Sequence, residues 1–216
     1  MTMLDLVTSY LNKATAKVDF LDELASSGHK DEARTLCLVY IDRLAQILSW
    51  PSEKSGEIFV NTLIGFGEDP WMGRFYPLQL ARALSTEDKL KPFSTEIAAA
   101  FPGPSYQLMD AITFEKEMRQ KIPKLQLSLL QKHAWKATVA NIAYKHLRVP
   151  AIHGLGSSGD LNLNATYNGT PAPILDLQRF KKCAIALIKE ARRRSEANGQ
   201  CFGDDRIFEC PEHYRF

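Results

Sequence analysis

An arginine and a histidine stand five positions apart in the stretch RVPAIHG, residues 148–154. Arg148 can hold a phosphate through two donors, and it stays charged at any working pH. His153 can take up or release a proton near neutrality. Together they form a minimal set for cleaving RNA without a metal: the histidine assists attack by the ribose 2′-hydroxyl while the arginine stabilises the crowded phosphate. A simpler hypothesis stays open, in which Arg148 is a cation at a helix end and His153 is a polar loop residue.

Helices must position this pair, because apolar residues before it recur at three- and four-residue steps. Such periods run over residues 4–25, over 32–50 up to Pro51, and over a shorter segment, 55–67. A long fourth helix is expected from about Ile122 to Leu147, with Pro123 in its first turn. Arg148 would then directly follow the last residue of that helix.

The segment 68–121 differs from the rest, since prolines interrupt it at positions 70, 77, 92, 102 and 104. Short helices are expected at 77–84 and 94–100, wrapped in loops. We interpret 68–121 as a proline-rich insertion or side layer of the fold.

A short β-hairpin is predicted after the Arg/His pair. Alternation across Leu161, Leu163, Ala165 and Tyr167 leads to Asn168-Gly169, a strong turn signal. A last helix is expected from Asp176 to about Ala197. The predicted fold class is therefore all-α, a mainly helical bundle in one domain over 1–216, with a short β-hairpin between its last two long helices.

The last helix divides into an apolar side and a basic side. The basic side carries Arg179, Lys182, Lys189 and Arg193, with Lys181 and Arg192 at its margin. Such a face could bind RNA phosphates by a salt-sensitive, sequence-independent attraction. Surface helices also carry lysine and arginine routinely, so an ordinary solvated face explains the same pattern.

The C-terminal residues 199–216 combine potential metal ligands with apolar side chains. Cys201, Cys210 and His213, with Asp204 or Asp205, could form a four-ligand set, but they lack the paired short spacings of recognisable zinc sites. A tail docked through its apolar residues explains them better. We therefore expect neither a metal nor a cofactor. Elsewhere, His146 stands two residues before Arg148, so on a helix it points away from that side chain.

Composition is that of an ordinary globular protein, with 45% hydrophobic and 24% charged residues. A net charge of +2 neither demands nor excludes a nucleic-acid partner. The four cysteines, without a secretory signal, indicate reduced thiols, and no apolar run is long enough for a membrane span. We expect a cytoplasmic protein.

The arrangement around Arg148 resembles that of the HEPN superfamily (higher eukaryotes and prokaryotes nucleotide-binding domains). YKHLRVPAIHG is followed by LNATYNGTPAPILDLQRFKKCAIALIKEA. These helical bundles carry an Arg-x4–6-His motif at and just after the end of a penultimate long helix. The second helix, with LCLVYIDRLAQIL, is also similar to an early core helix of the family. The resemblance covers about the first 66 and the last 100 residues, with the proline-rich middle outside it.

The resemblance implies a metal-independent endoribonuclease of the toxin–antitoxin or phage-defence type. Arg148 would bind the phosphate and His153 would be catalytic, in a homodimer with RNA and an antitoxin-like protein as partners. Active members commonly have a polar residue after the arginine, whereas this chain has Val149. Two alternatives therefore stay open: a non-catalytic HEPN-like module that binds a nucleotide or a protein, and a purely structural helical dimer.

Overall fold

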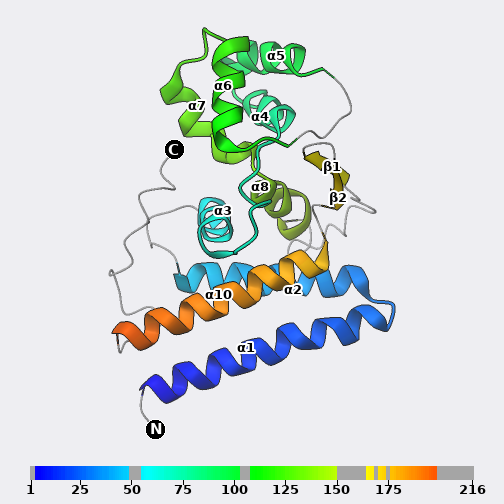
Figure 1. The fold of residues 1–216 in the computed structure, drawn as a ribbon, viewed down its shortest axis with the longest axis vertical. Helices are drawn as coiled ribbons and strands as arrows, with labels where there is room; N and C mark the ends of the chain where they lie inside the picture. The colour runs from blue at the N-terminus through cyan, green and yellow to red at the C-terminus, as the bar shows by residue number, and fades with distance from the viewer. Residues whose placement is uncertain are drawn as a thin grey trace.

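The computed structural model describes residues 3–48, 55–102, 108–149, 164–167, 170–173 and 176–198. Helices make up most of these residues, which confirms the mainly helical fold class (Figure 1). The elements are α1 (Met3–Ser26), α2 (Lys30–Leu48), α3 (Ser55–Phe66), α4 (Pro77–Leu84), η1 (Asp88–Leu90), α5 (Lys91–Ala100), α6 (Ala111–Lys121), α7 (Leu127–Ala134), η2 (Trp135–Ala137), α8 (Val139–Ala143), the π-helical turn η3 (Tyr144–Arg148), β1 (Asn164–Tyr167), β2 (Thr170–Pro173) and α10 (Leu177–Asn198).

The three long helices form a layer at one end of the molecule. α10 packs against both α1 and α2. α3 and α8 lie across α2 and α10 from α1 (Figure 1). Gly28 ends α1 with φ +97°, a left-handed conformation that glycine adopts without strain. The helices expected from periodicity at 4–25, 32–50 and 55–67 are thus confirmed, as is the last helix.

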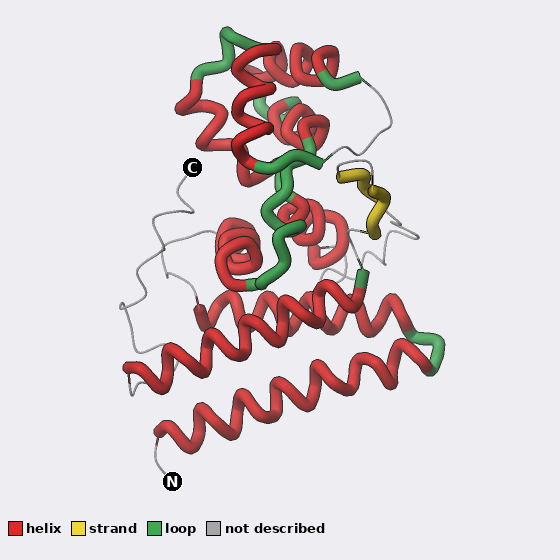
Figure 2. The backbone as a smooth tube through the Cα atoms, viewed as in Figure 1, coloured by secondary structure: helices red, strands yellow, loops and turns green. Residues whose placement is uncertain are grey.

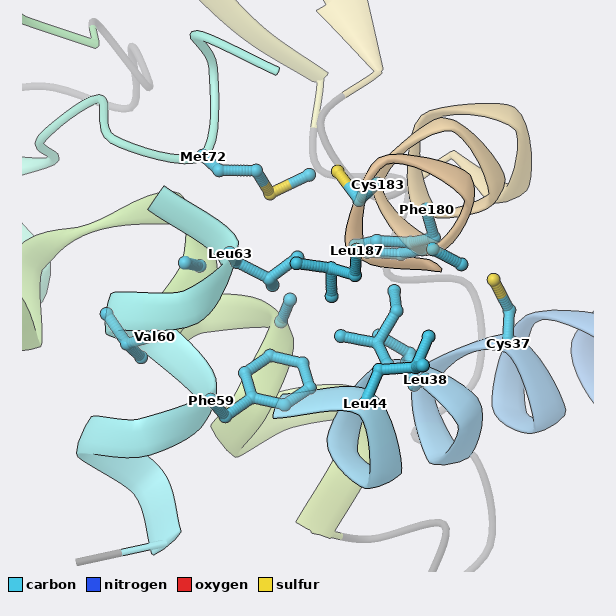
Figure 3. Packing of buried hydrophobic residues seen from close by; sticks show 14 of the residues in the cluster. Cys37, Leu38, Leu44, Phe59, Val60, Leu63, Met72, Phe180, Cys183 and Leu187 are labelled. Carbon is cyan, nitrogen blue, oxygen red and sulfur yellow. The ribbon is translucent and has the colours of Figure 1, made fainter. Parts of the chain in front are cut away.

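A first hydrophobic core joins this layer to α3 and α8. Figure 3 shows Phe59 and Leu63 of α3 pointing toward Leu38 and Leu44 of α2. Leu187 of α10 meets the same group, and these side chains are almost completely buried. Burial of each contributes about 2 kcal/mol. η3, which follows α8 directly, adds Leu147 to the same core.

A second core forms within the proline-rich part of the chain. It is built from α4, α5, α6 and α7, with Phe75 stacked on Phe114 at a ring distance of 4.7 Å. Helices expected at 77–84 and 94–100 are present as α4 and α5. The second core continues beyond residue 121 and ends at Ala137 of η2.

The prediction of one long helix from Ile122 to Leu147 is wrong. The chain forms α7, η2, α8 and η3 there, and Thr138 is extended with ψ 154°. The connection between α3 and α4 runs alongside the break (Figure 2). Backbone hydrogen bonds join the two segments: Tyr76 N–H donates to the Ala137 carbonyl at 2.8 Å, and Val139 N–H donates to the Arg74 carbonyl at 3.0 Å. These bonds replace the helical ones and divide the expected helix.

The strands β1 and β2 pair as an antiparallel two-stranded sheet between η3 and α10. Asn164 lies opposite Pro173, and Tyr167 lies opposite Thr170. The predicted turn at Asn168-Gly169 and the predicted docked tail at 199–216 lie outside the described residues.

Candidate functional site

Arg148 is the last residue of η3 and forms an ion pair with α2. Its Nη2 donates to Oδ2 of Asp42 at 2.8 Å, and each side chain keeps 15% of its surface exposed. His153 lies outside the described residues, so the structure places one member of the predicted pair. Arg148 is therefore a partly buried, oriented cation between two helices.

The aromatic ring of Tyr144 packs against the guanidinium group of Arg148. The guanidinium carbon lies 5.1 Å from the centre of the Tyr144 ring, which is a cation–π contact. The ring contacts Phe59 at 5.4 Å, and its hydroxyl lies 3.2 Å from the Ser55 hydroxyl. A Cβ on Gly56 would lie 2.9 Å from the Tyr144 ring, so a glycine is needed for this close approach. Residues of α3 thus fix the position of the Tyr144 ring.

The ion pair leaves hydrogen-bonding capacity unused. Nε of Arg148 and Oδ1 of Asp42 are buried without a hydrogen-bond partner among the described residues. Most buried polar atoms in proteins have such a partner, so an unpaired donor and an unpaired acceptor at one contact are unusual. Asp42 orients the guanidinium through a single bond and does not use all of its donors.

The π-helical turn itself concentrates positive charge. Its five residues include Lys145, His146 and Arg148. π-helical turns are rare and occur often at functional sites, although cations are also favoured at any helix C-terminus. His146 is half-buried, and its pKa is lowered by burial and by the charges of Arg82 and Lys145. Arg148, by contrast, faces α2, where Asp42 lies.

The predicted basic face of the last helix is partly neutralised. Arg179 donates to both oxygens of Asp69, at 3.2 and 3.1 Å, and its guanidinium lies 4.7 Å from the Trp71 ring. Arg193 binds Glu190 through two bonds of 2.8 Å. Lys182 and Lys189 are exposed.

The two residues at the margin of the basic face also have partners on α1. Lys181 is buried and paired with Asp22 of α1, and Arg192 donates to the Asn12 side chain at 2.9 Å. Lys181 and Arg192 therefore join α10 to α1, whereas Arg193 pairs within α10 itself.

The cysteines that the structure describes are packing residues. Cys37 and Cys183 are free and buried, and burial raises the pKa of each thiol to about 12. Such thiols stay protonated and unreactive. The proposed ligands Cys201, Cys210 and His213 lie outside the described residues, and the described part of the chain holds no group of three or more metal-ligating side chains.

Comparison with known proteins adds no assignment to this site. No family model, no curated protein and no solved structure matches the chain. Within the described ranges, no helix is long and apolar enough to cross a membrane.

Sequence reasoning singled out Arg148 but missed Asp42 and Tyr144. Two signals could have found them. Asp42 is an acid inside the apolar run LCLVYIDRLAQIL, and Tyr144 precedes Arg148 by one helical turn.

Proposed function

We propose that this protein is a HEPN-like module that binds RNA by contacting a phosphate with Arg148. The observation that carries the proposal is the π-helical turn η3, which presents Lys145 and the oriented Arg148 within five residues. Asp42 pairs with Arg148, and no carboxylate of the described residues pairs with Lys145.

Orientation supports this role, because a guanidinium that is already held in place loses less entropy when it binds a phosphate. Asp42 and the Tyr144 ring hold Arg148 from two directions. Asp42 offsets part of the charge of Arg148, while Lys145 restores the local excess of positive charge. A phosphate at the end of η3 would meet both cations.

The test is the affinity for a fluorescently labelled single-stranded RNA, measured by anisotropy. The informative variant is Asp42→Asn/Arg148→Gln, which replaces the ion pair with neutral groups of similar size and leaves no unpaired buried charge. We expect it to bind RNA about tenfold more weakly, since one charge-assisted contact is lost. Glu115→Gln/Arg119→Gln, which neutralises an ion pair on the surface of α6, is the matched control. Equal affinity of the double variant and the wild type would refute the proposal.

Metal-independent cleavage is the second candidate function, and the Arg148-x4-His153 spacing favours it. Binding needs Arg148 alone, whereas cleavage also needs His153 close to the same phosphate. RNA is incubated with the wild type and with His153→Ala in EDTA. Products from the wild type only would support a nuclease of the toxin–antitoxin or phage-defence type. Absence of products, or equal cleavage by both proteins, would refute the nuclease and leave the non-catalytic binding module as the proposed function.

The homodimer and the antitoxin-like partner belong to the same proposal, because the resemblance implies both. Light scattering on the purified chain tests the dimer, and purification together with the product of the neighbouring gene tests the partner. A monomer at micromolar concentration would contradict the dimer.

A further inference from the structure

The outer face of α1 is left open by the described part of the fold. α1 packs against α2 and α10, and Figure 1 shows it at the edge of the molecule with both helices on one side. Asn12 and Asp22 of α1 contact α10 through side-chain hydrogen bonds. Steps of four and three residues place a separate row of exposed side chains along the helix. We call this row the α1 seam, and its members are Ser9, Lys13, Ala16, Phe20 and Glu23.

The α1 seam has an apolar centre with opposite charges on its two sides. Phe20 is 52% exposed, and the alanine of the seam lies one turn before it. Lys13 precedes this apolar pair, and Glu23 follows it. Lys17, beside the seam, is directed toward α2, since its ammonium lies 5.9 Å from the centre of the Tyr40 ring. A lone exposed apolar side chain is ordinary on a protein surface, but an apolar centre between opposite charges is typical of a helix-pairing face.

The α1 seam is complementary to itself when two copies run antiparallel. Lys13 and Glu23 lie five positions before and after Val18, and Ala16 and Phe20 lie two positions before and after it. A two-fold axis at Val18 therefore places Lys13 of each copy opposite Glu23 of the other, and Ala16 opposite Phe20. Parallel helices would instead place like charges opposite each other. Lys13 and Glu23 are about 15 Å apart along one helix, so they cannot pair within a single chain.

We propose that the α1 seam is the surface on which two copies of this chain associate, antiparallel, as a symmetric dimer. Phe20 of each copy would pack on Ala16 of the other, whose small side chain leaves room for the ring. Two pairs of Lys13 and Glu23 would fix the register of the helices. The inference gives a surface to the homodimer of the proposed function and rests on that part of it. It uses none of the contacts of Arg148.

The charge pairs are tested by sedimentation velocity of the whole chain at several micromolar concentrations. Lys13→Glu and Glu23→Lys each place like charges opposite one another twice, because the two-fold axis repeats the contact. We expect each variant to dissociate at least about tenfold more readily than the wild type. An equimolar mixture of the two variants should associate again, since every pair is then a lysine opposite a glutamate. Lys116→Glu, the same change at an exposed position of α6, should behave like the wild type.

The apolar centre of the α1 seam has a separate test in the same measurement. Phe20→Ser removes the ring that would pack on Ala16, so its dimer should also dissociate at least about tenfold more readily. Ile112→Ser is the matched control, because Ile112 of α6 is 83% exposed and lies outside the seam. Both substituted positions are exposed, so the circular dichroism of both variants should equal that of the wild type.

The outcomes separate this surface from the rest of the proposed function. A monomeric wild type would refute the α1 seam together with the homodimer, and it would leave the RNA contact of Arg148 to its own test. A wild-type dimer that Phe20→Ser or the single charge variants leave unchanged would refute the seam alone. Charge variants that stay dissociated when they are mixed would overturn the antiparallel pairing, and with it the proposal.

Discussion

Arg148 and Asp42 form an ion pair in which both side chains are mostly shielded from solvent. The sequence singles out Arg148 because its type and its distance from His153 suit phosphate chemistry. It marks Asp42 only as an acid within an apolar run, and no local pattern links Asp42 to Arg148, which lies 106 residues later. Only the packing of α2 against η3 makes the two neighbours. The sequence thus predicts the arginine of the candidate site but not the pairing of this arginine with Asp42.

Removing one member of this pair should destabilise the protein more than removing both. Arg148→Met leaves the Asp42 carboxylate without its partner, and we expect it to lower the free energy of unfolding by about 2 kcal/mol. Asp42→Leu/Arg148→Met should recover most of that loss, because no charge is left unpaired. Urea denaturation checks both variants. A double variant no more stable than the single one would show that the ion pair is not the cause.

At the scale of elements, periodicity predicts a helix correctly where all its apolar residues face one core. α1, α2, α3 and α10 meet that condition. The segment 122–147 does not, because Leu130 and Ala134 belong to the second core while Ile142 and Leu147 belong to the first. One uninterrupted stripe in the sequence therefore serves two separate faces. The break at Thr138 depends on pairing with the distant 72–76 segment, which no local signal reveals.

α6 was not predicted, although its first turn carries a local signal. Asp110 is its N-cap, and its carboxylate accepts a hydrogen bond from the Thr113 N–H at 2.8 Å. This bond lowers the pKa of Asp110, with a further contribution from the Thr113 hydroxyl. An aspartate before an amphipathic run is a typical helix start.

Loss of this cap should destabilise the second core. Asp110→Ala is expected to lower the free energy of unfolding by about 1 kcal/mol, because the Thr113 N–H loses its acceptor. Asp19→Ala, an exposed position in the middle of α1, is the control and should have little effect. Denaturation curves of the two variants that coincide would contradict this account of α6.

For the whole molecule, the segments 72–76 and 137–140 tie the two cores together. Met72, Tyr76 and Val139 belong to the first core, whereas Phe75 and Ala137 belong to the second. Each short segment thus contributes side chains to both cores. We expect the cores to unfold in one cooperative transition, because neither keeps its boundary when the other is lost.

His133 makes that transition sensitive to pH. It is buried in α7, its Nδ1 has no hydrogen-bond partner within the described part of the chain, and the Glu87 carboxylate lies 3.9 Å away. Its pKa is lowered by burial and then by the charge of Lys136. The unfolded chain therefore binds a proton at a higher pH than the folded protein does. Stability should be full above the ordinary histidine value of 6.5 and fall as the pH drops below it.

Thermal unfolding between about pH 7.5 and pH 5.5 measures this effect. His133→Gln should flatten the decline, while His29→Gln, at an exposed position, should not. His146 shifts in the same direction, so His133→Gln should remove part of the decline and not all of it. A wild type equally stable across this range would contradict the assignment.

The salt dependence of RNA binding tests the central claim most directly. Anisotropy titrations at several salt concentrations give the slope of log affinity against log salt for the wild type and for Asp42→Asn/Arg148→Gln. If Arg148 contacts a phosphate, the double variant should bind about tenfold more weakly, and its slope should be shallower by about one. The same affinity and the same slope in both proteins would show that Arg148 does not contact RNA.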